Sequence, residues 1–191
     1  MKCLLCKNYS LTHICSNCQE LFLTPSIYHR LLPNGTQVIS FYKYEDIKEL
    51  LFSKHTDLGF YIYTILAKCS FAKFANTFNT KEQYVSIGID DNIKSGYSHT
   101  AILNKHLQSY SIEPLFNKLR ATNSLSYSGQ SRLFREENPR NFKLNNFKRS
   151  NVILVDDIVT TGTTLTQAIE VLHKADKKVT FCLTLCDVNN K

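Results

Sequence analysis

The sequence lacks the signatures of several large protein classes. None of its six glycines is followed by lysine, so it has no Walker A loop. No histidine is followed by glutamate, and no serine has a glycine two residues away on both sides, which argues against zincin metalloproteases and nucleophile-elbow hydrolases. The longest uncharged apolar run, residues 58–67, has 10 residues, whereas a bilayer crossing takes about 20. The chain also lacks internal repeats and low-complexity tracts.

No apolar segment long enough for a secretory signal follows Lys2, because Lys7 and Asn8 interrupt it within a few residues. We therefore expect a cytosolic protein, in which the seven cysteines are thiols or metal ligands and not a disulfide framework. The 191 residues, 43% of them hydrophobic, predict one domain of ordinary size with a small appendage.

Four of the cysteines form two C-x-x-C pairs near the N-terminus, namely Cys3 with Cys6 and Cys15 with Cys18. Two such turns can close a tetrahedral shell of four thiolates around zinc, with Zn–S distances of about 2.3 Å. Residues 1–22 hold too few apolar side chains for a core of their own, so metal binding would supply most of their folding energy. An iron–sulfur cluster, or His13 as a replacement ligand, is the alternative. For the remaining cysteines the expectation is buried, inert thiols; they are Cys69, Cys182 and Cys186.

The rest of the chain alternates β-branched or aromatic runs with helical spacing, which predicts an α/β fold with a mainly parallel sheet. A helix of unusual length is expected over residues 57–78. The expected strands cover residues 36–44, 84–89, 112–119, 151–156 and 178–185, and the other expected helices cover residues 45–54, 97–106 and 162–175.

The most informative segment is residues 151–164. Four apolar residues predict a buried parallel strand, and two adjacent carboxylates, Asp156 and Asp157, follow it. Small hydroxyl residues and a glycine then precede a helix, where backbone N–H groups and hydroxyls can hold a phosphate. Carboxylates that accept bonds from O2 and O3, beside a phosphate cradle, suit a ribose 5-phosphate. The cradle residues are Thr160, Thr161, Gly162, Thr163 and Thr164.

Residues 117–150 carry most of the net charge of +7, with eight basic residues against two acidic ones. Charge alone leaves two interpretations open: a solvated surface loop, or a surface that meets phosphates. Aromatic residues lie between the cations, an arrangement typical of sequence-tolerant binding of single-stranded nucleic acid. Phe142 and Phe147 could equally be core residues.

The acidic pair followed by Thr-Thr-Gly-Thr-Thr resembles the 5-phosphoribosyl-1-pyrophosphate (PRPP) loop of type I phosphoribosyltransferases. Together with the four-cysteine N-terminus, it makes the chain similar to the ComF family of competence proteins. Further matches to the patterns of that family are Tyr44 with the segment 47–51, Gly96-Tyr97 with Ala101, and the spaced set Arg120, Gln130, Arg135, Asn138 and Phe142. Two segments depart from the family: its V-P-V-P pyrophosphate loop reads Val85-Ser-Ile-Gly88, and its R-G-F-N-Q motif reads Ser95-Gly-Tyr-Ser-His99.

The resemblance implies a type I phosphoribosyltransferase-like fold over residues 23–191, preceded by a four-cysteine zinc finger over residues 1–22. Within the larger domain it implies a hood-like region over residues 36–80, a basic flexible segment over residues 117–150 and a PRPP-binding unit over residues 151–186. It also implies bound Mg²⁺ with PRPP, and a pyrophosphate loop at Ile87, Gly88 and Ile89.

The same resemblance implies a role in natural transformation, with single-stranded DNA, a competence helicase or ATPase and membrane DNA-channel components as partners. The expected location is the cytoplasm, with a peripheral position at the inner face of the cytoplasmic membrane. An ordinary salvage or biosynthetic phosphoribosyltransferase with a structural zinc is the alternative, and a zinc-ribbon regulator with PRPP as effector is a weaker third. No residue stands out as the general base. The DNA-binding candidates are Arg120, Tyr127, Arg132, Phe134, Arg135, Arg140, Lys143, Lys148 and Arg149.

Overall fold

The computed structural model describes residues 1–90, 96–122 and 140–189. Its elements, in chain order, are α1 (Ser16–Phe22), β1 (Tyr28–Leu31), β2 (Gln37–Lys43), α2 (Tyr44–Leu51), the 3₁₀ helix η1 (Phe52–His55), α3 (Asp57–Cys69), α4 (Phe71–Thr77), β3 (Tyr84–Asp90), α5 (His99–Lys105), β4 (Ile112–Ala121), β5 (Phe142–Leu144), β6 (Asn151–Val159), α7 (Thr163–Lys174) and β7 (Lys178–Asp187).

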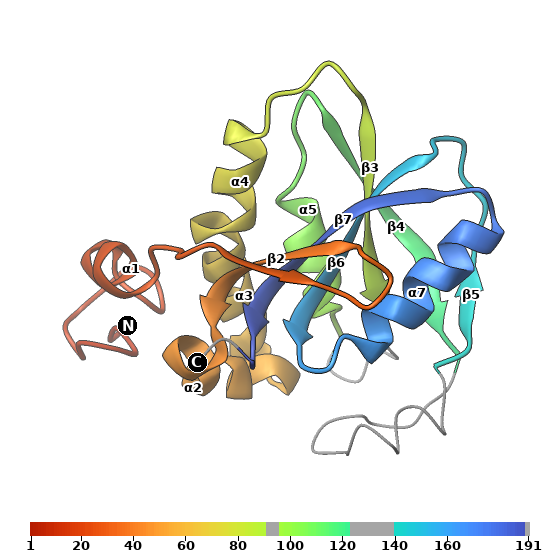
Figure 1. The fold of residues 1–191 in the computed structure, drawn as a ribbon. Coiled ribbons are helices and arrows are strands. Elements are labelled where there is room, and N and C mark those ends of the chain that lie inside the picture. Colours follow the sequence, from red (N-terminus) through yellow and green to blue (C-terminus); the bar gives the residue numbers. More distant parts are fainter. Residues whose placement is uncertain (91–95, 123–139, 190–191) are drawn as a thin grey trace.

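One sheet organises the described residues, with seven strands in the order β1-β2-β7-β6-β3-β4-β5 (Figure 1). The five inner strands run parallel to one another. The two edge strands, β1 and β5, pair antiparallel with their neighbours. The α/β fold with a mainly parallel sheet, expected from the sequence, is confirmed.

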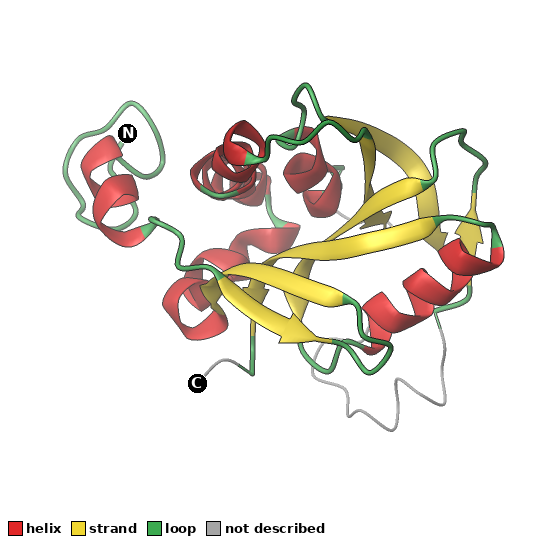
Figure 2. Cartoon of the chain, turned by 45° about the horizontal axis from the view of Figure 1, so that its top comes forward, coloured by secondary structure: helices red, strands yellow, loops and turns green. Residues whose placement is uncertain are grey.

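Helices cover both faces of the sheet, as the turned view also shows (Figure 2). On β6, Ile153 and Val155 belong to the core on the side of α3, α4 and α5, while Val152 and Leu154 belong to the core on the side of α7. All four side chains are buried, as expected of a central parallel strand covered on both sides.

The helix expected over residues 57–78 is wrong as a single element, because α3 and α4 meet at Ser70. Ser70 has φ −119° and ψ −76°, and its hydroxyl donates to the Leu66 carbonyl at 2.6 Å. Side-chain bonding of serine to the preceding turn is a known way to bend a helix. The sequence holds no glycine or proline there to signal the break.

The N-terminal segment packs on the main body through apolar side chains. Cys3, Ile14 and Cys18 are buried in the same cluster as Phe41 and Tyr63. This cluster continues the core on the α3 side of the sheet, so residues 1–22 do not form a separate core. No helix in the described part of the chain combines the length and apolar content that a membrane crossing needs.

Candidate ligand site and candidate metal centre

The acidic pair, Asp156 and Asp157, lies near the carboxyl end of the central strand β6. The sequence predicted that the strand ends at Asp156, but β6 continues to Val159 because β7 pairs with it along this stretch. The carboxyl ends of parallel strands are where open α/β sheets bind ligands. Asp157 is buried and Asp156 is half-buried, so the two neighbouring carboxylates have different surroundings.

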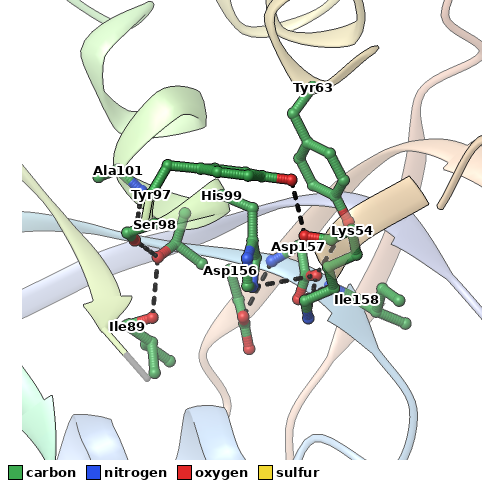
Figure 3. Close-up of polar contacts among 11 residues, drawn as sticks. Lys54, Tyr63, Ile89, Tyr97, Ser98, His99, Ala101, Asp156, Asp157 and Ile158 are labelled. Atoms are coloured by element: carbon green, nitrogen blue, oxygen red, sulfur yellow. Dashed lines mark hydrogen bonds and ion pairs between the residues drawn. The ribbon is translucent and has the colours of Figure 1, made fainter. Parts of the chain in front are cut away.

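Asp157 is held from several elements at once (Figure 3). Lys54 Nζ lies 2.6 Å from its Oδ2, and the Tyr63 hydroxyl donates to the same oxygen at 3.3 Å. The backbone N–H of Ile158 donates to Oδ1 at 2.9 Å. His99 Nε2 lies 3.6 Å from Oδ2, which is a contact and not a hydrogen bond. Both oxygens of this carboxylate are therefore engaged by the protein.

Lys54 is fixed through its own backbone. The Tyr97 hydroxyl donates to the carbonyls of Lys54, at 2.7 Å, and Thr56, at 3.1 Å. Gly59 makes this approach possible, since a Cβ there would collide with the Tyr97 hydroxyl and the Ser53 carbonyl. The start of α3 and the segment before α5 are thus joined beside the acidic pair.

Burial and neighbouring charge separate the titration of the two carboxylates. Burial, followed by the charge of Asp157, raises the pKa of Asp156 above its usual range. Burial also acts to raise the pKa of Asp157, but the charge of Lys54 and the neighbouring His99 outweigh it, and the net shift is downward. The site therefore holds Asp157 firmly ionised, while Asp156 resists ionisation.

Two basic groups complete the electrostatic surroundings. Burial lowers the pKa of His99 to about 4, so its imidazole is neutral at pH 7. Burial also lowers the pKa of Arg140, although Asp156 and Asp157 oppose the shift. An arginine remains protonated under such perturbation. Arg140, a DNA-binding candidate of the sequence, is thus a half-buried cation whose charge interacts with both carboxylates.

The threonine loop (residues 160–164) leads from β6 into α7. Gly162 has φ +81°, in the left-handed region that favours glycine, and a Cβ there would lie 2.5 Å from Leu32 Cδ2. The Thr161 and Thr163 hydroxyls lie 2.9 Å apart. The Thr160 carbonyl accepts bonds from Arg30 at 2.7 Å and from Asn189 at 3.0 Å. Backbone N–H groups at the start of the 12-residue α7 are suited to an anion.

The pyrophosphate-loop candidates lie inside strand β3 and not in a loop. Ile87 and Ile89 are buried, and Gly88 pairs with Val155 of β6. The Thr100 hydroxyl donates to the Ile89 carbonyl at 3.0 Å. The side chains of Ile87 and Ile89 therefore serve the core, and residues 91–95, which follow β3, lie outside the described residues.

The structure brings only part of the predicted DNA surface together. Arg120 and Lys143 are register partners on β4 and β5, and both are exposed. Arg149 pairs with Glu113 at 3.2 Å, and Lys148 is exposed. Four further candidates lie outside the described residues: Tyr127, Arg132, Phe134 and Arg135. Of the two aromatic residues left open, Phe147 is buried, and Phe142 is half-buried against the α7 side of the core.

The four N-terminal cysteines meet at one point. Their Sγ atoms lie within 4.8 Å of one another, and Cys6 Sγ is 3.7 Å from Cys15 Sγ. A tetrahedron with Zn–S bonds of about 2.3 Å has edges of roughly 3.8 Å, so this spacing fits zinc. The Cys15 backbone N–H also donates to Cys3 Sγ at 3.3 Å, which is suited to a thiolate. The set Cys3, Cys6, Cys15 and Cys18 could therefore hold a metal ion such as zinc.

The other three cysteines are all buried, as expected. Burial raises the pKa of each thiol. These thiols are therefore protonated and unreactive at pH 7.

Sequence reasoning missed the side chains that surround Asp157 and support the threonine loop. No spacing rule connects them with the acidic pair, because they lie on other elements far along the chain. Only the segments that carry the family resemblance pointed near two of them, at Gly96-Tyr97 and at the residues just before η1. The missed residues are Arg30, Lys54, Tyr63 and His99.

A family model described as the phosphoribosyl transferase domain matches residues 116–191. No curated protein sequence matches the chain. Similar solved structures include a hypoxanthine phosphoribosyltransferase from Staphylococcus aureus, at 19% identity over 65% of this chain and 62% of that one, with a TM-score of 0.36. The chain thus spans less than two thirds of that enzyme's length.

Two further structures are similar over more of the chain. An orotate phosphoribosyltransferase from Aeropyrum pernix has 17% identity over 90% of this chain and 80% of its own, with a TM-score of 0.43. An adenine phosphoribosyltransferase has 17% identity over 90% and 89%, also with a TM-score of 0.43. The match that bears on the site is that of the family model, since residues 116–191 include the acidic pair, the threonine loop and α7: this part of the chain is similar to a phosphoribosyl transferase domain.

Proposed function

We propose that the chain binds PRPP or a related ribose 5-phosphate at the carboxyl edge of its sheet. The observation that carries this proposal is the acidic pair on β6, followed directly by the threonine loop and the start of α7. Gly162 lets the backbone turn there without a Cβ, and the N–H groups that open α7 are suited to the 5-phosphate.

In this proposal the two carboxylates of the acidic pair have different roles. Asp156 is half-buried and accepts the backbone N–H of Asp157 at 2.9 Å, so it is the carboxylate placed to accept a bond from a ribose hydroxyl. Asp157 lies behind it, with both oxygens engaged. Mg²⁺ would enter with PRPP as an ion on its pyrophosphate, where it neutralises negative charge.

We infer a phosphoribosyltransferase as the activity that fits this site best, with residues 23–191 as its domain and residues 1–22 as a metal-binding knuckle that stabilises it. Breaking the bond to pyrophosphate leaves positive charge on the ribose, and a carboxylate next to the ribose would stabilise it. The proposal includes no general base.

Calorimetry with Mg²⁺-PRPP, ribose 5-phosphate and inorganic phosphate tests the proposal. We expect PRPP and ribose 5-phosphate to bind and Asp156→Ala to weaken both. Asp46→Ala, which removes an exposed carboxylate at the start of α2, should leave the affinity unchanged. Pyrophosphate release with a panel of nucleobases then identifies an acceptor. Absence of binding of any ribose phosphate to the unmutated protein would refute the proposal.

A competence role with single-stranded DNA is the second candidate. It rests on the resemblance to the ComF family, and the exposed register pair of Arg120 and Lys143 favours it. Each phosphate contact with a single strand contributes about −0.7 to the log–log salt slope of the affinity. Arg120→Ala with Lys143→Ala should therefore flatten the slope by roughly 1.4. The matched control removes two lysines of α2 and α3, Lys48 and Lys68. An unchanged slope in the first variant would refute a DNA contact at this pair.

A further inference from the structure

The ion pair between Lys54 and Asp157 is the shortest of the polar contacts at the candidate site. Lys54 itself belongs to neither the acidic pair nor the threonine loop. The two atoms are 2.6 Å apart, and the Lys54 and Asp157 side chains are 23% and 7% exposed. A pair so short and so shielded is screened much less than a surface salt bridge. The charge of Lys54 therefore acts strongly on the carboxylates beside it.

The protein holds Lys54 in this position by contacts unrelated to its charge. The Tyr97 hydroxyl donates to the Lys54 carbonyl, and Gly59 leaves the space that this hydroxyl needs. The Tyr63 hydroxyl shares the carboxylate oxygen that Lys54 contacts. The ammonium is thus placed before any ligand arrives, as expected for a group with a role in the site.

We propose that Lys54 is a positioning residue of the candidate site: its ammonium fixes Asp157 and favours the ionised form of Asp156, so that Asp156 can accept a bond from a ligand hydroxyl at neutral pH. This inference rests on the proposed ribose-phosphate function and deepens it. The Lys54 ammonium would also be a cation of the protein itself next to the acidic pair, independent of any metal ion that a ligand carries.

The charges around the pair support this assignment. The two carboxyl groups lie side by side in a buried site, and they cannot both ionise unless positive charges nearby compensate for the repulsion. Lys54 and Arg140 supply two positive charges, which balance them. Without Lys54 one negative charge is left over, and the pair must take up a proton more readily. The titratable and charged groups that interact with the pair are Lys54 from η1, Tyr63 from α3, His99 from α5, Arg140 before β5, and Cys182 and Cys186 from β7, while His55 acts on His99.

The test measures protonation of Asp156 directly, by carboxyl carbon NMR as a function of pH, with Asp156→Asn to assign the signal. In Lys54→Met we expect the Asp156 midpoint to rise by roughly 1–3 pH units, because the positive charge that sits on the neighbouring Asp157 is lost from beside the pair. Lys54→Arg should keep the unmutated midpoint. Lys48→Met, which removes an exposed lysine paired with Glu45, is the matched control.

Ribose 5-phosphate binding is followed in the same variants. At pH 7 the affinity of Lys54→Met should fall by about tenfold for each unit by which the new midpoint exceeds pH 7, and should recover as the pH rises above that midpoint. A residue that only stabilised the fold would weaken binding equally at every pH. The recovery at high pH therefore separates the two roles.

A second set of variants keeps the inference testable if Lys54→Met does not fold. Asp157→Asn retains the cation and should lower the Asp156 midpoint, and Asp157→Asn with Lys54→Met removes both charges and should bring the midpoint back up. Equal midpoints in these two variants, or an unmoved midpoint in Lys54→Met, would overturn the inference. If the midpoints move as expected but no ribose phosphate binds the unmutated protein, the proposed function fails and the effect of Lys54 on the pair stands.

Discussion

Replacing His99 by glutamine should remove much of the acid sensitivity of the folded protein. His99 is the first residue of α5 and is 8% exposed, with its ring against Tyr63 at a centroid distance of 5.5 Å. Burial lowers its pKa from 6.5 to about 4, although the charge of Asp157 opposes the shift. The folded state thus keeps this imidazole neutral over a pH range in which the unfolded chain binds a proton.

The sign and size of the effect follow from proton linkage. Because the unfolded state binds more protons between the two pKa values, the free energy of unfolding falls as the pH drops through this window. With pKa values of 6.5 unfolded and about 4 folded, acidification from about pH 7 to about pH 4.5 costs about 2 kcal/mol at this one residue. Glutamine keeps a donor near the position of Nε2 and does not titrate.

Urea unfolding at a series of pH values measures this contribution. The unmutated protein should lose about 2 kcal/mol more than His99→Gln between pH 7 and pH 4.5. His29→Gln, at an exposed histidine on β1, should follow the unmutated protein. Parallel pH curves for His99→Gln and the unmutated protein would refute the assignment of a buried, neutral imidazole, whatever the absolute stability of the variant.

Three further predictions concern the metal centre and the threonine loop. Cys6→Ser should reduce bound zinc well below one equivalent, as measured by atomic absorption, whereas Cys182→Ser should retain it. Chelator treatment of the unmutated protein should lower its melting temperature, as seen by calorimetry, because metal binding contributes to folding. Gly162→Ala should destabilise the protein by about 1 kcal/mol or more and weaken ribose 5-phosphate binding in calorimetry, because φ is +81° there and Leu32 fills the space.

The elements of the sheet could be predicted where apolar residues form contiguous runs. Residues 152–155 indicated a central strand without ambiguity, and β6 and β7 follow the expected ranges closely. The edge strands β1 and β5 were missed, since a short strand with alternating burial leaves little signal. The break at Ser70 was missed because it depends on one side-chain hydrogen bond.

The candidate site could be predicted only where its residues are neighbours in the sequence. The acidic pair and the threonine loop form one motif, so their chemistry can be inferred without a fold. Tyr63 is 94 residues away from Asp157, and its hydroxyl finds that carboxylate only when α3 packs beside β6. For the pyrophosphate-loop candidates, a motif of neighbouring residues did not predict the local structure. The family pattern places residues 87–89 in a loop, whereas in this chain they belong to strand β3.

The apolar cluster that joins residues 1–22 to the rest of the protein has a consequence for how the protein unfolds. Ile14 and Cys18 lie in the same cluster as Phe41 and Tyr63, and the Tyr42 hydroxyl donates to the Leu23 carbonyl at 2.8 Å. An appendage with its own core would melt in a transition of its own. Here metal release would instead loosen the N-terminal side of a shared apolar cluster, and the same cluster holds Tyr63 against Asp157. Metal occupancy at one end of the molecule and order at the ligand site would then be lost in a single thermal transition.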